Sequence, residues 1–139
     1  MIRGREPTWI DERDALAIHE RLIALHGGPP GVRDASLLAS ALARPRQVRA
    51  YVRRTDVVAL AAACTVGIVR NHPFVDGNKR TGFVLGVLLL ELNGFVFDAA
   101  EEDAARAVIA LAAGAPDQNG HAALLRDGSH AEGSGASGR

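Results

Sequence analysis

The stretch His72-Pro-Phe-Val-Asp-Gly-Asn-Lys-Arg80 separates the two most apolar segments of the chain. The segment before it, which Thr55 is expected to cap, runs to about Arg70 and is apolar on nearly every side. The segment after it, residues 78–93, has the same character. A helix that is apolar all round belongs in the centre of a bundle. The sequence therefore predicts two central, buried helices that are joined by a short polar loop.

The polar residues of this loop suggest that it binds phosphate. Because the second helix begins within Gly77-Asn78-Lys79, its free N–H groups and the positive end of its dipole point out of the loop. Such a helix end is an anion site, and phosphate is the usual anion. Gly77 has no Cβ and lets the backbone come close to phosphate oxygens. Lys79 adds a point charge and Arg80 a bidentate fork.

Two further residues of the loop favour phosphoryl-transfer chemistry. Asp76 supplies the hard oxygen ligand that Mg²⁺ prefers, next to phosphates that would supply others. His72 stands at the other end of the loop, and a histidine titrates near neutral pH, which suits proton removal from a hydroxyl. Phe74 is expected to point inward and anchor the loop to the core. Phosphoryl transfer needs positioning, charge neutralisation and a base, and the loop supplies all three.

Helical spacing continues on the N-terminal side of these elements. A first helix is predicted from Asp11 to about His26, where a Gly-Gly-Pro-Pro run ends it. A second, shorter helix is predicted from Asp34, as N-cap, to just before Pro45. Residues 44–54 are basic and irregular, which indicates a surface loop or a short hairpin. That segment is either a solvated loop or a flap that docks a target protein.

The C-terminal third completes the predicted domain. Residues 95–97 are an extended link, and two further helices are expected at about 99–113 and 117–126. Residues 127–139 are rich in glycine and serine, which predicts a disordered tail. The expected domain is therefore all-α and spans residues 1–126.

Composition excludes several classes of function. The 139 residues fit one domain, with 47% hydrophobic and 23% charged residues. Lys+Arg and Asp+Glu both number 16, so no net field draws the chain to nucleic acid or to an anionic membrane. A single cysteine, Cys64, rules out an internal disulfide and a cysteine-based zinc site. The N-terminus predicts no secretory signal, and the longest apolar run is far shorter than the roughly 20 residues of a bilayer span. The expectation is a soluble, cytoplasmic protein.

The motif resembles the signature of Fic-fold proteins, in the variant typical of Doc ("death on curing") toxins. The resemblance covers roughly residues 8–126 and includes five further segments: Ala15–Glu20, Gly31–Asp34, Leu42–Pro45, Gly67–His72 and Leu90–Gly94. It implies a compact all-α bundle of Fic type, with the motif loop between two central helices.

The resemblance also implies roles for the motif residues. It makes His72 the general base and Asp76 the Mg²⁺ ligand. It places Asn78, Lys79 and Arg80 against nucleotide phosphates, and Phe74 and Gly77 complete the expected nucleotide-binding set. The implied cofactors are ATP, or another nucleoside triphosphate, and Mg²⁺.

Lys79 bears on the reaction. Most Fic proteins have a second glycine there and transfer AMP, whereas Doc-type members carry lysine, whose side chain obstructs close backbone approach. Phe83 stands where many Fic signatures have a second arginine, as is common in Doc-type motifs. The resemblance thus implies a toxin that phosphorylates a Ser or Thr hydroxyl of a translation factor similar to elongation factor Tu, neutralised by a small Phd-like antitoxin. An AMP-transferase and a non-catalytic binding module are the alternatives.

Two residues outside the motif are interpreted as structural. His19 is taken for a residue on one face of the first helix whose hydrogen bonds are satisfied. Arg33 is taken for a loop residue that has a structural partner and no part in catalysis.

Overall fold

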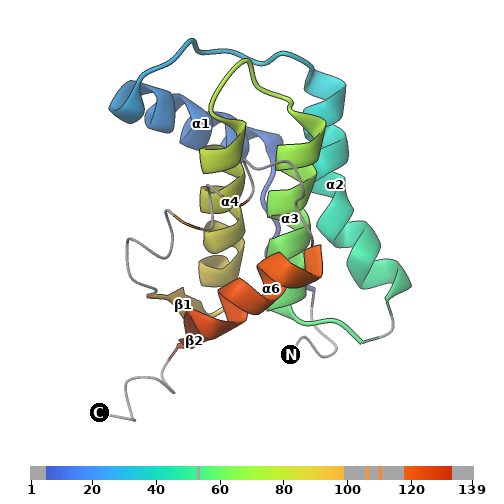
Figure 1. Cartoon of the computed structure of the whole chain (residues 1–139). Coiled ribbons are helices and arrows are strands. Elements are labelled where there is room, and N and C mark those ends of the chain that lie inside the picture. Colours follow the sequence, from blue (N-terminus) through green and yellow to red (C-terminus); the bar gives the residue numbers. More distant parts are fainter. Residues whose placement is uncertain (1–5, 53, 99–105, 107–109, 111–117, 133–139) are drawn as a thin grey trace.

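The computed structural model describes residues 6–52, 54–98, 106, 110 and 118–132. They form five named helices and a small sheet: α1 (Glu12–His26), α2 (Ala35–Tyr51), α3 (Val57–Asn71), α4 (Asn78–Leu92), β1 (Phe95–Phe97), α6 (Gln118–Asp127) and β2 (Ser129–Ala131). Figure 1 shows α3 and α4 in the middle of the bundle, with α1, α2 and α6 around them. The predicted helical bundle is confirmed. None of the described helices combines the length and hydropathy needed to cross a bilayer.

The packing of α3 against α4 forms the centre of the core. Eleven residues of α3, from Val57 to Ile68, are buried. Two glycines of α4 face α3 closely: a Cβ on Gly86 would overlap the hydroxyl of Thr65, and one on Gly82 would lie 3.1 Å from the Thr65 carbonyl oxygen. The Thr65 hydroxyl donates a hydrogen bond of 2.7 Å to the Gly82 carbonyl. Because these glycines lack side chains, the two central helices approach each other closely.

Aspartates begin three of the helices. Asp11 caps α1 and exchanges hydrogen bonds with Asp14 in a capping box, and Asp34 caps α2. Both helix starts agree with the sequence prediction. The cap of α3 is Asp56, one residue beyond the predicted Thr55, and its carboxylate accepts a bond from the Ala59 N–H. Each cap satisfies backbone donors that have no partner inside their helix.

The prediction for residues 44–54 is wrong, because α2 continues through Pro45 to Tyr51. A proline inside a helix removes one hydrogen bond, but Pro45 is fully buried here, so hydrophobic burial offsets that loss. Two of the basic side chains pack on other parts of the protein, and whether this segment docks a target stays a prediction. Arg44 donates two bonds to the Gln118 side chain, and the Arg46 guanidinium lies 5.2 Å from the centre of the Trp9 ring.

The C-terminal residues are more ordered than the sequence predicts. The helix expected at 117–126 is α6, which ends at Asp127. Residues 129–131, expected to be disordered, form β2, which pairs antiparallel with β1 in the register Val96 to His130. Most of the helix expected at 99–113, and residues 133–139 of the expected tail, lie outside the described residues.

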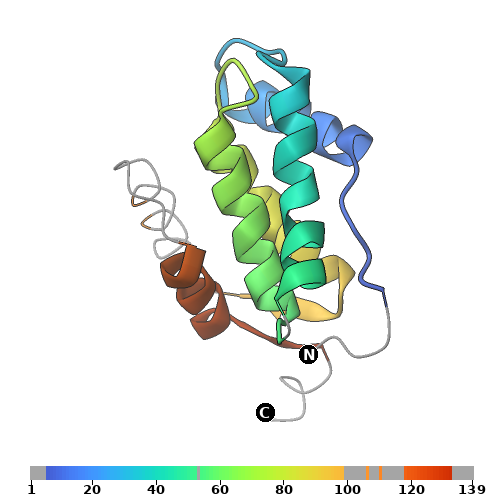
Figure 2. The same cartoon turned by 90° about the vertical axis from the view of Figure 1, so that its right-hand side faces the viewer.

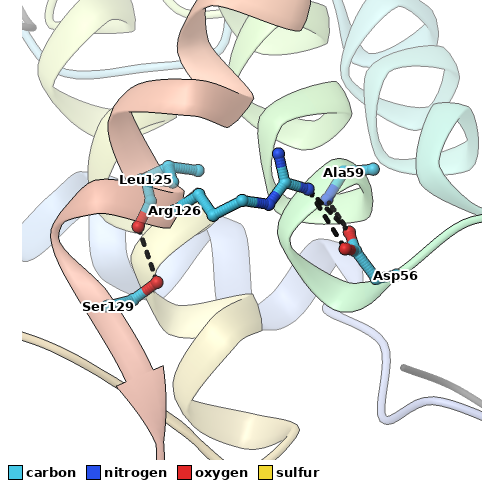
Figure 3. Close-up of polar contacts among 5 residues, drawn as sticks. All are labelled: Asp56, Ala59, Leu125, Arg126 and Ser129. Carbon is cyan, nitrogen blue, oxygen red and sulfur yellow. Dashed lines mark hydrogen bonds and ion pairs between the residues drawn. The ribbon is translucent and has the colours of Figure 1, made fainter.

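The end of α6 is anchored to the start of α3, as Figure 3 shows. The Arg126 guanidinium reaches both carboxylate oxygens of Asp56, at 3.1 and 3.2 Å. Where the chain leaves α6 for β2, the Ser129 hydroxyl donates a hydrogen bond of 2.6 Å to the Leu125 carbonyl.

Candidate active site

The motif occupies the turn between the two central helices, as the sequence predicts. α3 ends at Asn71, and His72 follows in the left-handed region with φ 53° and ψ 53°. Gly77, with φ 78°, then begins α4. A left-handed conformation costs a residue other than glycine roughly 1–2 kcal/mol, so the surrounding contacts must hold His72 in place. Its side chain is exposed at the surface of the loop.

Arg33 provides this support from the loop between α1 and α2. Its Nε donates a hydrogen bond of 2.7 Å to the His72 carbonyl oxygen, and its Nη2 donates one of 3.0 Å to the Asn71 carbonyl oxygen. These carbonyls are at the C-terminus of α3, where backbone acceptors lack partners within the helix. The sequence indicated some structural pairing for Arg33, and the structure identifies it as the cap of the helix that carries His72.

The loop between α1 and α2 runs antiparallel to the motif loop. The backbone N–H of Arg33 donates a hydrogen bond of 2.7 Å to the Pro73 carbonyl, and that of Val75 donates one of 3.0 Å to the Gly31 carbonyl. Val32 and Phe74 form the bridge between the two segments. Figures 1 and 2 show both loops at the same end of the bundle. The motif loop is therefore held by backbone bonds on one side as well as by its own helices.

Phe74 and Asn78 lie beneath the loop. Phe74 is fully buried, so it points inward as expected. Asn78 is 4% exposed, and its amide exchanges two hydrogen bonds with the main chain of Phe74, at 2.9 and 3.0 Å. The resemblance placed both residues among the nucleotide contacts. In the structure their side chains hold the loop, which leaves the backbone N–H of Asn78 for an anion.

The start of α4 is the cationic end of the site. Whereas Asp11, Asp34 and Asp56 cap their helices, Gly77 offers α4 no side-chain cap. Lys79 and Arg80 follow in the first turn, both exposed, and no acidic residue accompanies them there. Two cations at the positive end of a helix dipole are unfavourable on their own. A phosphate bound at this end would satisfy both the free N–H groups and the side-chain charges.

Asp76 precedes this helix end and is exposed. Its main-chain oxygen lies 2.8 Å from Nε2 of His19 on α1. Its carboxylate lies against the backbone of Gly28, so close that a Cβ on that glycine would overlap it. Across the described residues, no group of three or more His, Cys, Asp or Glu side chains could hold a metal ion. A Mg²⁺ ion at Asp76 would therefore take its other ligands from phosphate and water, as this ion commonly does.

Sequence reasoning missed the contact of His19 with the motif. The signal was a polar, titratable side chain on the apolar face of a helix, but a helical pattern does not say which neighbour such a side chain meets. The structure thus gathers His72, Asp76, Lys79 and Arg80 on one exposed loop and helix start, above the buried Phe74.

Comparison with known proteins identifies this arrangement. A model of the Fic/DOC family matches residues 9–90, which is more than half of the chain and includes the whole motif. The chain belongs to the Fic/DOC family. The predicted Fic/Doc resemblance is thereby confirmed.

Two relatives within the Fic/DOC family carry the Doc name. The chain is 34% identical over 93 residues to the protein kinase doc of Escherichia phage P1, a match that covers 66% of this chain and 74% of the phage protein. It is 44% identical over 90 residues to the toxin Doc of Mycolicibacterium smegmatis, covering 62% of this chain and 65% of that protein. The chain thus spans just under two thirds of the mycobacterial relative.

Proposed function

We propose that this protein is a Doc-type toxin with kinase activity, which transfers a phosphoryl group from a nucleoside triphosphate to a Ser or Thr hydroxyl of a target protein. The observation that carries this proposal is the exposed set of His72, Asp76, Lys79 and Arg80 at the uncapped start of α4. The similarity to a protein kinase doc and to a toxin Doc supports it.

The nucleotide would bind through its phosphates. The backbone N–H groups of the first turn of α4, together with Lys79 and Arg80, match a polyphosphate in charge and in hydrogen bonding. Asp76 fits a Mg²⁺ ion, since its carboxylate is exposed and Gly28 has no side chain to cover it. Bound there, the ion would neutralise charge on the transferring phosphoryl group.

His72 would act as the general base. Its main chain is held by Arg33, and within the described part of the chain no hydrogen bond or ion pair occupies its ring. The imidazole would take the proton of the target hydroxyl, whose oxygen forms a bond to the γ-phosphorus. As that bond forms, the bond from this phosphorus to the bridging oxygen breaks and the nucleoside diphosphate leaves. Lys79 and Arg80 would stabilise the negative charge that remains on the leaving diphosphate.

The target and the partner follow from the Doc-type resemblance. The proposed target is a translation elongation factor similar to elongation factor Tu, whose modification in the cytoplasm would inhibit translation. The proposed partner is a small Phd-like antitoxin that neutralises the toxin.

Transfer of label from ATP tests the reaction. The purified protein, Mg²⁺ and elongation factor Tu are incubated with ATP labelled either at the γ- or at the α-phosphate. The expected result is label on the factor from the γ-position only, lost in His72→Ala and kept in His130→Ala, a histidine variant in β2 at the other end of the bundle. Transfer from the α-position would instead make the protein an AMP-transferase. Unchanged cellular toxicity of His72→Ala would point to a non-catalytic binding module.

A further inference from the structure

His19 contacts the motif from a different helix and is 4% exposed. A buried imidazole needs a hydrogen-bond partner, because burial without one is costly. The partner of Nε2 is the main-chain oxygen of Asp76, at 2.8 Å. A carbonyl oxygen can only accept, so Nε2 must carry a proton. His19 is therefore a donor to the backbone of the predicted metal ligand.

The ring of His19 makes a second contact with the same loop. It stacks on Phe74, with ring centroids 3.9 Å apart and planes 6° from parallel. The loop between Phe74 and Asp76 is thus held at both ends by one side chain. Since the carbonyl and the carboxylate of Asp76 share one Cα, restraining the carbonyl limits the directions in which the carboxylate can point.

The surroundings of Asp76 reinforce this restraint. A Cβ on Gly77 would lie 3.4 Å from Cδ1 of Ile23 and 3.8 Å from Nε2 of His19, so α1 packs directly against the start of α4. The backbone of Gly28, in the loop after α1, lies against the Asp76 carboxylate. Residues of α1 and of the loop that follows it therefore contact Asp76 and Gly77 and leave the rest of the Asp76 side chain exposed.

We propose that His19 is a positioning residue for Asp76, which directs the carboxylate toward the Mg²⁺ ion that accompanies the nucleotide. This inference rests on the proposed function and deepens it. His19 is buried and acts through its bond to the Asp76 main chain, so its role is positioning and not catalytic. A leucine or phenylalanine could fill the same buried space, but only a donor at the position of Nε2 holds the Asp76 carbonyl.

Variants of His19 separate its two contacts. His19→Phe keeps a ring to stack on Phe74 and removes the donor, whereas His19→Gln keeps an N–H donor and removes the ring. For each variant, binding of a fluorescent ATP analogue is measured in EDTA and again while Mg²⁺ is titrated, with urea unfolding as the measure of stability. His130→Phe, in β2, is the matched control.

For His19→Phe we expect a folded protein whose nucleotide binding in EDTA is unchanged. The Mg²⁺ concentration at half-saturation should rise by about tenfold or more, as is typical when the partner of a metal ligand is removed. His19→Gln should recover part of this loss. In the wild type, ¹⁵N NMR without nucleotide should show His19 as the Nε2–H tautomer, with a slowly exchanging proton.

Three results would overturn the proposal. The first is a folded His19→Phe variant whose Mg²⁺ concentration at half-saturation is unchanged. The second is a loss of nucleotide binding by His19→Phe that is as large in EDTA as in Mg²⁺. The third is the Nδ1–H tautomer of His19 in the wild type. If His19→Phe does not fold, the Mg²⁺ titration of His19→Gln and the NMR tautomer of wild-type His19 test the proposal. A wild type that binds no nucleotide would reject the proposed function instead, and the tautomer would still report on His19.

Discussion

The side-chain amide of Asn78 forms two hydrogen bonds with the main chain of Phe74. Its Nδ2 donates a bond of 3.0 Å to the Phe74 carbonyl, and its Oδ1 accepts a bond of 2.9 Å from the Phe74 N–H. Both residues are buried. The pair joins the first turn of α4 to the middle of the motif loop. An asparagine suits this position because one planar amide offers a donor and an acceptor side by side.

Asn78→Ala should lower both stability and activity. The substitution leaves the N–H and carbonyl of Phe74 buried without these partners, at a cost of about 1–3 kcal/mol per group at most. We expect a lower urea midpoint and a strongly reduced rate of phosphoryl transfer. Asn93→Ala is the matched control, since Asn93 makes the same pair of bonds to the main chain of Thr8, at 2.8 and 2.9 Å, at the far end of α4. That variant should lose stability and keep its rate; a normal rate in Asn78→Ala would mean that the loop holds its shape without the amide.

Arg33→Lys should slow phosphoryl transfer while nucleotide affinity stays unchanged. Lysine cannot make the forked bonds to the carbonyls of Asn71 and His72, so the main chain that carries the proposed base is released. Rates at saturating ATP and nucleotide affinity are measured side by side. Arg126→Lys is the control: it alters an exposed ion pair with Asp56 that is worth about 0–1 kcal/mol, and the rate should not change. A fall in affinity without a fall in rate would contradict this role for Arg33.

Gly86→Ala should destabilise the central helix pair. The added methyl group would overlap the Thr65 hydroxyl and lie 3.0 Å from the Ala61 carbonyl oxygen, and overpacking of this kind costs about 1–3 kcal/mol. Urea unfolding measures the loss. Thr65→Ala combined with Gly86→Ala should recover part of it, because the overlapping hydroxyl is gone.

Gly120→Ala is the control for that substitution. Gly120 is exposed within α6, where alanine should stabilise the helix by about 0.5–1 kcal/mol. If Gly86→Ala were equally stabilising, α3 and α4 would not be packed as closely as the structure has them.

His121 predicts a pH-dependent stability. Burial lowers the pKa of His121 from 6.5 to about 4, and its Nε2 has no hydrogen-bond partner in the described part of the chain. Between these two values the unfolded chain binds a proton that the folded chain does not. The contribution of His121 to the free energy of unfolding is therefore fully present above pH 6.5 and is lost as the pH falls toward 4. The free energy of unfolding falls by about 1.4 kcal/mol per pH unit at most.

Urea unfolding between pH 7.5 and pH 4.5 measures this effect. His121→Phe keeps an aromatic ring next to Phe83, whose centroid lies 6.1 Å from that of His121, and removes the titrating group. The variant should lose less stability on acidification than the wild type. Parallel pH profiles of the two proteins would show that His121 is not buried in its neutral form.

Much of the fold could be predicted because its signals are local. Among the helices that the structure describes, three of the four longest were predicted to within about two residues at each end, since apolar periodicity, aspartate caps and glycine stops act through neighbours in the chain. The exception is α2, where the proline rule predicted an end that burial of Pro45 overrides. Likewise, a strand as short as β2 has no signal of its own and exists through its pairing with β1.

By itself, the sequence determined the residue types of the motif and their order: a histidine, an acid, a glycine and two cations at the start of a helix. Only the tertiary structure decided how these residues are held, because the contacts come from elsewhere in the chain. Arg33 is 39 residues from His72, and His19 is 57 residues from Asp76. Helical periodicity shows which face of a helix is buried, but the partner across that face depends on how the helices pack. For that reason the sequence could place His19 on the apolar face of its helix, whereas it could not predict the bond to Asp76.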